Sequence, residues 1–290
     1  MFNNILNYTI QENDKTVKRV LKENLNFSSR LSKRLEENSK IFLNGKAVKL
    51  NKSVFKGDEL SIEFDEEEDE YAAVDIPIDI IYEDEGLLIV NKQPHMVVHP
   101  TRSHQDNTLA NGVAYYFKNK GIKRKVRFVN RLDMNTSGIV IIAKNPYVHN
   151  QLAEQMKENS VEKYYYAIVE GVLRGEGTIN EPIVRLREED IVRVVHPSGK
   201  ESITHYRAEK TFNNMTLVKL KLITGRTHQV RVHMKHIGHP IVGDTLYGKE
   251  STLIDRQALH CYEMKFINPL SGEDLRVTCP LPEDMKFVEG

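Results

Sequence analysis

Apolar residues near the start of the chain recur at the spacing of an amphipathic helix. Val17, Val20 and Leu21 lie three and four positions apart, on one helical face. Asp14 precedes this run and is a candidate N-cap, because its carboxylate can accept hydrogen bonds from the first free N–H groups. Residues 28–35 repeat the pattern and predict a second short helix, with two leucines facing inward.

The next segment has the patterns of β-structure. The apolar stretches 41–43 and 46–48 flank Asn44 and Gly45, a pair typical of a two-residue hairpin turn. Residues 60–64 alternate between apolar and polar and predict a further strand. The first part of the chain is therefore expected to contain two helices followed by a small sheet.

The rest of the chain is rich in predicted strands. The segments 192–195 and 203–206 are expected to pair around the turn at 196–199. Strands are expected at 80–82, 87–90, 126–129, 139–143, 165–169, 192–195, 203–206 and 215–223, and helices at 149–158 and 227–236. Helices and strands do not alternate regularly enough for a doubly wound parallel sheet. We therefore predict an α+β fold with a mixed, mostly antiparallel sheet.

Charge divides the chain where the pattern changes. The chain has 290 residues, enough for about two domains. Its 41 basic and 41 acidic residues balance, but between residues 15 and 57 there are twelve Lys or Arg against three Glu, a net charge of +9. Residues 58–70 then hold nine acids and no base. We predict a basic module at 1–65, an acidic linker at 66–76 and a larger domain at 77–290.

Several classes of protein are disfavoured by the sequence. No apolar run approaches the ~18 residues of a membrane span, and the N-terminus lacks the basic, then apolar pattern of a signal peptide. The two cysteines, Cys261 and Cys279, exclude a disulfide framework and favour buried thiols in a cytoplasmic protein. The glycine-rich nucleotide-binding motifs are missing, so no cofactor is expected.

The first candidate for chemistry is the segment 130–138, which lies between two predicted strands. Asp133 follows Arg131, and the small residues at 136–138 would allow a ligand to approach. A structural turn is the alternative: Asp133 would then cap backbone N–H groups, and Gly138 would supply an unusual φ. From these residues alone, the turn is the more common role for an aspartate.

The second candidate is the basic segment 224–240. A metal site is conceivable because four histidines lie close together, but their 5-3-3 spacing does not put three imidazoles on one helical face. An Arg here can instead bind a carboxylate or a phosphate. The histidines in question are His228, His233, His236 and His239. A solvated basic helix and an RNA-binding surface both remain open.

The third candidate is the strand that contains three consecutive tyrosines. Alternation places Tyr165 on one side of the strand and Tyr164 and Tyr166 on the other. An aromatic ring beside a basic loop can stack on a nucleobase. Taken alone, however, these tyrosines are equally typical of a core in which the hydroxyl groups find partners.

Together these segments resemble the RluA family of pseudouridine synthases. Five ordered blocks, spread over about residues 80–285, carry the resemblance. They are 87–94 with 98–100, 131–133 with 136–138, 163–171, 225–248, and 256–260 with 280–282. Asn130 departs from the family, in which a His usually precedes the Arg-Leu-Asp triplet. Residues 15–62 are similar to the small RNA-binding module of ribosomal small-subunit protein four.

The resemblance implies an enzyme that isomerises uridine in RNA without a metal or cofactor. It assigns Asp133 as the catalytic carboxylate and Arg231 as the salt-bridge partner that holds it ionised and oriented, with Arg226 as the second choice. It implies that Tyr165 stacks on the uracil and helps to remove the C5 proton. The residues expected to bind RNA are Arg131, Arg226, His228 and Lys163 near the reaction, and Arg30, Lys33 and Arg34 in the module.

The substrate and the alternatives follow from the same resemblance. Large-subunit ribosomal RNA is favoured over transfer RNA, because family members with this module act on it. We expect a monomer. A non-catalytic RNA-binding or ribosome-assembly factor on the same fold is the main alternative, and the intact set of Asp133, Tyr165 and Arg231 argues against it.

Overall fold

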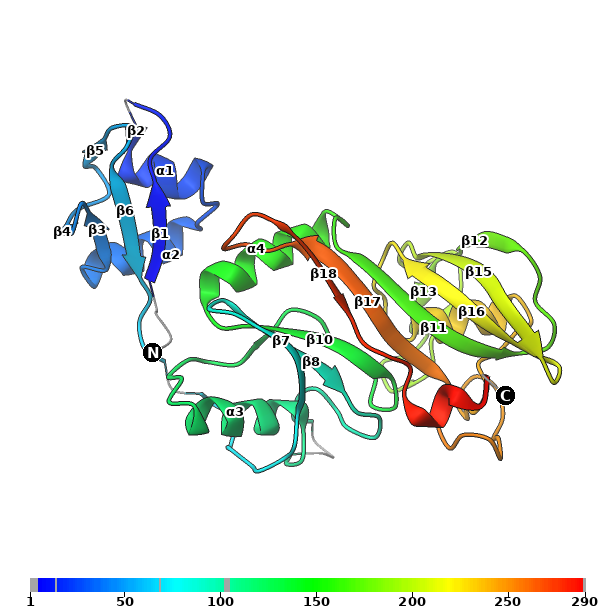
Figure 1. Ribbon diagram of the computed structural model, residues 1–290. Helices are drawn as coiled ribbons and strands as arrows, with labels where there is room; N and C mark the ends of the chain where they lie inside the picture. Colours follow the sequence, from blue (N-terminus) through cyan, green and yellow to red (C-terminus); the bar gives the residue numbers. More distant parts are fainter. Residues whose placement is uncertain (1–4, 14, 68, 102–104, 289–290) are drawn as a thin grey trace.

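The N-terminal part of the chain forms a small α/β unit. The structure, a computed structural model, describes residues 5–13, 15–67, 69–101 and 105–288 (Figure 1). Four strands form one sheet in the order β1-β6-β3-β4, and a further pair joins β2 to β5. The elements are β1 (Ile5–Thr9), β2 (Lys15–Thr16), α1 (Val17–Glu23), α2 (Ser29–Glu37), β3 (Ile41–Leu43), β4 (Lys46–Ala47), β5 (Ser53–Val54) and β6 (Glu59–Glu63).

Local sequence explains most of this unit. The predicted N-cap Asp14 lies outside the described residues, and the cap of α1 is Thr16, whose hydroxyl accepts the N–H of Arg19. Between β3 and β4, Asn44 and Gly45 have φ values of 50° and 77°, as the predicted two-residue turn requires. The two helices and the hairpin are therefore where the apolar pattern puts them.

A larger sheet organises the rest of the chain. Its main path runs β12-β15-β16-β11-β17-β10-β8-β7, with β18 beside β17 and β9 beside β10. Among the pairs in the described residues, β10 and β17 are parallel and the others antiparallel, which confirms the predicted fold class. The strands are β7 (Asp79–Glu83), β8 (Leu87–Lys92), β9 (Arg127–Phe128), β10 (Ser137–Ala143), β11 (Glu162–Glu170), β12 (Glu176–Asn180), β15 (Ile203–Phe212), β16 (Met215–Leu222), β17 (Leu259–Ile267) and β18 (Asp274–Thr278).

Helices and a short strand pair complete the larger part. The helices are α3 (Leu109–Asn119), α4 (Pro146–Lys157) and α5 (Gln229–His236), with a 3-10 helix η1 (Glu283–Val288) near the C-terminus. The pair is β13 (Ile183–Val184) with β14 (Val194–Val195). None of the helices in the described residues is long and apolar enough to cross a bilayer.

The structure corrects two sequence-based predictions. Segment 192–195 does not pair with 203–206. Strand β14 pairs with β13, and the backbone of Lys200 bridges to Ile183, so the turn at 196–199 returns the chain to β13. Helix α5 begins at Gln229 rather than Thr227, because His228 adopts the left-handed conformation (φ 59°).

The acidic segment joins the two parts of the chain through ion pairs. Arg34 of α2 lies 3.6 Å from Asp65 and 3.7 Å from Glu67. The same segment pairs with the basic stretch 123–127, which runs into β9, through Glu66 with Lys123, Glu67 with Arg127, and Glu70 with Lys125. Several of these groups are exposed, so the pairs contribute little to stability. The domain boundaries at 65 and 77 stay a prediction.

The small unit also packs against α4. The rings of Phe27 and Tyr147 lie 5.0 Å apart, and Gln151 donates a hydrogen bond of 2.7 Å to the carbonyl of Leu25. In Figure 1 the blue unit accordingly lies beside α4, away from the strands β11, β16 and β15.

Strand β10 lies at the centre of the hydrophobic core. All seven of its residues are buried, and Ile139 to Ile142 are fully so. Burial of each such side chain contributes about 1.5–3 kcal/mol, so this strand is a rigid support for the loop that precedes it.

Gly138 sets the approach of β10 to β17. Its φ is 116°, and a Cβ at this position would lie 2.2 Å from the carbonyl oxygen of Cys261. A side chain therefore meets both a forbidden backbone conformation and the backbone of the neighbouring strand.

We predict that Gly138→Ala destabilises the fold by about 3 kcal/mol or more, because the clash is with backbone that cannot move aside. Gly175→Ala is the matched control: its φ of 71° carries a cost of about 1–2 kcal/mol, but its Cβ would point into open space. Urea unfolding of both variants measures the difference. Equal losses of stability would contradict the close approach of the two strands.

Candidate active site

Asp133 lies at the bottom of a cavity beside the centre of the large sheet. Its loop connects β9 to β10, and the cavity has a volume of about 640 Å³, in the range of small-molecule sites. A smaller hollow of about 70 Å³ continues toward Arg231 and His228. Around Asp133, the charged or aromatic residues that line the main cavity are Arg131, Lys157, Lys163, Tyr165, Glu201 and Arg226. We call it the Asp133 cavity.

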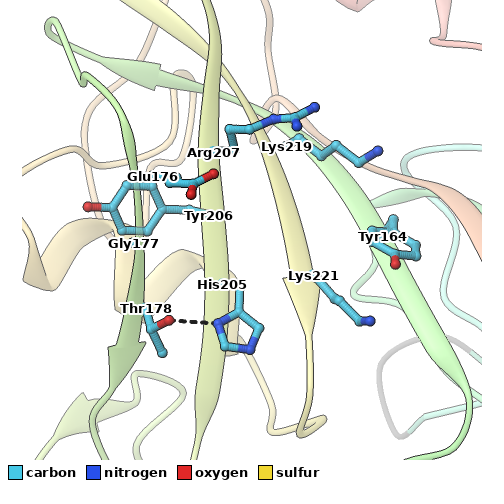
Figure 2. Close-up of a pocket in the computed structure, with 9 residues that line it drawn as sticks. All are labelled: Tyr164, Glu176, Gly177, Thr178, His205, Tyr206, Arg207, Lys219 and Lys221. Carbon is cyan, nitrogen blue, oxygen red and sulfur yellow. Dashed lines mark hydrogen bonds between the residues drawn. The ribbon is translucent and has the colours of Figure 1, made fainter.

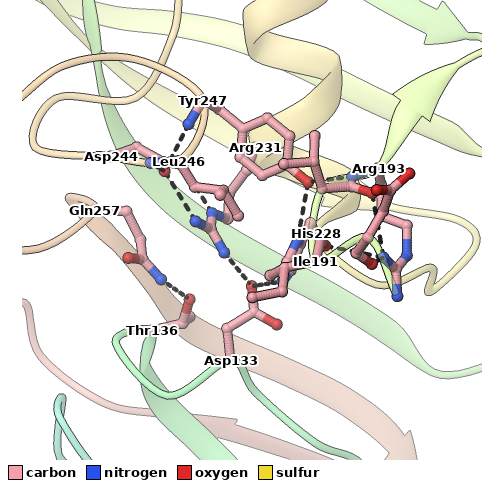
Figure 3. A network of polar contacts seen from close by, with 12 residues as sticks. Asp133, Thr136, Ile191, Arg193, His228, Arg231, Asp244, Leu246, Tyr247 and Gln257 are labelled. Atoms are coloured by element: carbon pink, nitrogen blue, oxygen red, sulfur yellow. Dashed lines mark hydrogen bonds and ion pairs between the residues drawn. The ribbon is translucent and has the colours of Figure 1, made fainter. Parts of the chain in front are cut away.

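Two basic side chains of the 224–240 segment face the Asp133 carboxylate (Figure 3). Arg231 donates from Nη1 to Oδ2 of Asp133 at 3.1 Å, and His228 Nε2 lies 3.8 Å from the same oxygen. The Asp133 side chain keeps 22% of its surface exposed, so it remains accessible to a substrate. The ion pair expected between Asp133 and Arg231 is present.

Arg231 is held mainly by a second carboxylate. Its Nε and Nη2 donate to the two oxygens of Asp244 at 2.7 and 2.9 Å, and the Asp244 side chain is fully buried. Burial alone would lower the pKa of Arg231, but Asp244 and Asp133 outweigh it and raise that pKa. The bidentate pair fixes the guanidinium, and Nη1 is the nitrogen that donates to Asp133.

His228 connects the site to a surface loop. Its Nδ1 lies 2.8 Å from the hydroxyl of Tyr247, which also accepts the backbone N–H of Arg193 at 2.7 Å. When Tyr247 donates its proton to Nδ1, the imidazole carries hydrogen on Nε2, the atom nearest Asp133. Burial lowers the pKa of His228, partly opposed by the charge of Asp133, so the neutral imidazole is favoured near pH 7.

Two buried basic side chains bind backbone carbonyls of the Asp133 loop. Lys92 donates to the carbonyls of Gln93, Met96 and Met134, and burial lowers the pKa of Lys92 to about 7. Arg256 donates to the carbonyl of Asn135 at 3.0 Å. The bonds to Met134 and Asn135 fix the backbone directly after Asp133 without contacting its carboxylate.

Tyr165 and Lys163 extend from β11 toward the cavity, whereas Tyr164 and Tyr166 face the other side of the sheet. The predicted alternation is therefore correct. Burial raises the pKa of Tyr165 well above its usual value. The phenol is therefore neutral, which suits stacking on a base but not removal of a proton by a phenolate.

The other residues expected to bind RNA fall into two groups. Arg131, Lys163 and Arg226 line the Asp133 cavity, and His228 lines the smaller hollow that continues it. Arg30, Lys33 and Arg34 lie on α2, outside the lining of that cavity. All three are exposed; Lys33 lies 3.7 Å from Glu37 of the same helix, and Arg34 pairs with the acidic segment. The structure thus brings together the first group and not the second.

Asn130 has a structural role in place of the family's usual His. Its amide donates to the carbonyl of Ile139 at 3.0 Å and accepts the N–H of Ile141 at 2.8 Å. This pair of bonds joins the start of the loop to β10. Asn130 also lines the Asp133 cavity, so it contributes to both support and surface.

Analysis of the sequence missed the supporting residues. Asp244, Tyr247, Arg256 and Gln257 were visible only as parts of the resembling blocks, and Lys92 as part of the first block. Their partners lie between 13 and 121 positions away along the chain, so no local pattern marks them. Within the described residues, no group of three or more His, Cys, Asp or Glu is arranged to hold a metal.

Known proteins similar to this chain agree on one family. Residues 86–236 match the model of the RNA pseudouridylate synthase family. The chain is 41% identical over 252 residues to the uncharacterized RNA pseudouridine synthase YjbO of Bacillus subtilis, covering 86% of this chain and 89% of that protein. It is 37% identical over 262 residues to ribosomal large subunit pseudouridine synthase D of Escherichia coli, covering 85% and 80%.

A solved structure gives the same result. The human RNA pseudouridylate synthase domain containing 1 protein is 28% identical, with a TM-score of 0.59. The match covers 70% of this chain and 83% of that one.

Strand β17, which lies beside the Asp133 loop, contains the buried residue His260. His260 Nδ1 lies 2.9 Å from the hydroxyl of Ser137, at the start of β10, and Nε2 lies 3.2 Å from the sulfur of Cys279. Burial lowers the pKa of His260 to about 4. In the unfolded chain this group binds a proton below pH ~6.5, whereas in the folded chain it does not.

We predict that His260 makes the fold less stable as the pH falls from about 6.5 to about 4. The contribution of neutral His260 to the free energy of unfolding is complete above pH ~6.5. About 2–3 kcal/mol of this free energy is lost by pH ~4.5. Urea unfolding at pH ~7.5 and ~4.5 should show this loss in the wild type and a correspondingly smaller one in His260→Asn. His236→Asn, at an exposed position at the end of α5, is the control and should match the wild type. An unchanged pH dependence in His260→Asn would rule the mechanism out.

Proposed function

The chain belongs to the RNA pseudouridylate synthase family, and from this premise we propose that it isomerises uridines of large-subunit ribosomal RNA with Asp133 as the nucleophile. The arrangement of Asp133, Arg231 and Asp244 at the end of an open cavity carries this proposal. The name of the Escherichia coli relative, a ribosomal large subunit synthase, supports the choice of RNA. We expect the enzyme to act as a cytoplasmic monomer.

The reaction needs one ionised carboxylate in a fixed place. The N1–C1′ bond of uridine breaks, the base turns, and C5 bonds to C1′. A carboxylate can assist by adding to C6, by attacking C1′ or by acting as base at C2′. Arg231 donates two bonds to Asp244 and one to Oδ2 of Asp133, so Oδ1 of Asp133 stays free to react.

The cavity can replace the stacking contacts that a nucleotide loses when it flips out of the RNA. A base must leave its stack to reach Asp133, at a cost of a few kcal/mol that is lowest in loops and bulges. The neutral ring of Tyr165 can replace part of the stacking. Arg131, Lys163 and Arg226 then offer positive charge to the adjoining phosphates.

The small N-terminal unit would add affinity rather than chemistry. We propose that it binds RNA like the module of ribosomal small-subunit protein four. Its basic segment has a charge of +9, and Arg30 and Lys33 are exposed on α2. Such contacts are mostly independent of sequence and weaken with salt.

We predict that Asp133→Asn lowers pseudouridine formation by at least roughly a thousandfold and leaves RNA binding nearly unchanged, because the amide keeps the shape of the site and loses the nucleophile. Pseudouridine mapping on ribosomal RNA from cells that lack the protein, restored with wild type or variant, measures this. Asp274→Asn, at an exposed position on β18, is the control and should restore the marks. Marks restored by Asp133→Asn would refute the role of Asp133.

A second prediction concerns the small unit. Arg30→Glu combined with Lys33→Glu should weaken binding to a long ribosomal RNA fragment and should leave turnover of a short target stem-loop nearly unchanged, because α2 lies outside the lining of the Asp133 cavity. Lys118→Glu with Lys120→Glu on α3 makes the same change of charge elsewhere on the surface. Binding by gel shift and turnover by pseudouridine detection test this. An equal loss on both RNAs would contradict the role of the unit.

A further inference from the structure

A second cavity adjoins the first on the side of a surface loop. Its volume is about 520 Å³, and one wall is formed by β13 and the segment that follows it to Lys200. The other wall is Gly225 to Thr227, which also lines the Asp133 cavity. We call it the loop cavity. The two cavities thus meet at Arg226.

The charged lining of the loop cavity is entirely basic. Four cations contribute to it, namely Arg185, Arg193, Lys200 and Arg226, and no carboxylate does. The Asp133 cavity, in comparison, contains Asp133 and Glu201 among its lining residues. A concave surface with charge of one sign concentrates ions of the opposite sign.

The hydrogen bonds of these arginines orient them without neutralising them. Arg185 donates to the carbonyl of Glu188 at 2.7 Å, and Arg226 donates to that of Glu201 at 3.0 Å. Arg193 donates from Nη1 to three carbonyls of its own loop, at residues 190–192. In the part of the chain that the structure describes, no carboxylate lies within 4.0 Å of the charged nitrogens of the four cations.

The loop contains acids, but they are directed elsewhere. Glu188 and Glu189 are exposed, and the half-buried Asp190 accepts the backbone N–H of Arg187 at 3.1 Å. None of the three lines the loop cavity. The loop as a whole is therefore close to neutral, while the cavity side carries the positive charge.

A hollow on the outer face of the sheet shows the opposite arrangement. In Figure 2, Lys219 and Lys221 extend from β16 and Arg207 extends from β15. Tyr164 lines the same hollow. There Lys221 pairs with Glu162, Arg207 lies 2.7 Å from Glu209, and Lys219 lies over the Tyr164 ring at 5.2 Å. Glu176 also lines this hollow. Its cations already have partners, so the unpaired cations of the loop cavity are the better candidates for an external anion.

The exposed apolar residues of the loop favour a nucleotide over a free anion. Ile191 and Leu186 keep 71% and 62% of their surface exposed beside the cationic wall. Exposed apolar side chains of this size can contact the sugar or base edges of an RNA strand, whereas inorganic phosphate offers them nothing.

The loop is also joined to the reactive site. The backbone N–H of Arg193 donates to the hydroxyl of Tyr247, which contacts His228 beside Asp133 (Figure 3). A ligand that orders the loop therefore acts on a segment already bonded to the catalytic side chains.

From these observations we propose that the loop cavity is a binding subsite for the RNA backbone next to the target uridine, with Arg185, Arg193 and Lys200 as its phosphate-binding residues. The inference rests on the proposed function, because the Asp133 cavity supplies the target. The phosphates of one strand pass from Arg226 into the loop cavity, and Ile191 lies beside the neighbouring nucleotide.

The test uses Arg185→Ala and Lys200→Ala in the full-length enzyme. Arg193 is left intact because its bonds shape the loop. The probe is a ribosomal RNA stem-loop that the wild type converts, and its Kd is measured by fluorescence anisotropy at several KCl concentrations. We expect each variant to raise Kd and KM on the order of fivefold, to reduce the slope of log Kd against log salt by about 0.7–0.9, and to change kcat less than twofold.

Lys219→Ala in the outer hollow is the matched control, since it also removes one positive charge from the lining of a hollow in the same domain. We expect its Kd and salt slope to equal those of the wild type. An equal loss in Lys219→Ala, or no loss in the loop variants while the RNA is still converted, would overturn the subsite. Inorganic phosphate gives a further test. If millimolar phosphate binds in the loop cavity but the Kd for RNA does not change in Arg185→Ala and Lys200→Ala, the site is one for a free anion and the proposal fails.

The two proposals fail in different ways. If the RNA binds with the expected dependence on Arg185 and Lys200 but no pseudouridine forms, the subsite stands and the proposed function falls. If pseudouridine forms and the Kd for RNA does not depend on Arg185 or Lys200, only the proposed subsite is refuted.

Discussion

The buried ion pair of Arg231 with Asp244 is the contact on which the reactive site depends. Removing a guanidinium and a carboxylate from water costs several kcal/mol for each ion, and this cost is recovered only with good geometry. Asp244 meets that condition with two bonds to Arg231 and two more from the N–H groups of Leu246 and Tyr247. With its position set in this way, Arg231 presents Nη1 to Asp133. The arginine therefore places the reactive carboxylate, and Asp244 places the arginine.

The loop that carries Asp133 is fixed by contacts from several distant segments. Lys92 binds the carbonyl of Met134, Arg256 binds that of Asn135, and Gly138 allows β17 to approach. Each of these contacts is to backbone, so the side chain of Asp133 stays available for chemistry. The arrangement matches a general requirement of catalysis, in which the reacting group is held before the substrate arrives.

The sequence was informative where a property is local and uninformative where it arises from long-range packing. The alternation in β11 correctly placed Tyr165 in the cavity and Tyr164 outside it. The left-handed residue His228, however, delays the start of helix α5 by two residues, and a basic run gives no sign of that. Helix α3 was missed because its Asn111 and Gly112 weaken the helical signal. Asn111 completes a capping box with Thr108, and Gly112 makes room for Ile76 and Ile78.

Charge follows the same division. The chain is neutral as a whole, yet its ions serve two purposes that composition cannot separate. Where ions hold the structure they are paired, as in Arg231 with Asp244 and Arg256 with Asp284. Along the cavities the side chains of Arg131, Arg185 and Lys200 lie without a carboxylate partner among the described residues. An RNA strand would supply the missing negative charge, and the gain in free energy comes from counterions released as it binds. The cations without a carboxylate partner therefore indicate the path of the substrate more directly than the total charge does. The charge of a paired ion is already neutralised by its partner within the fold.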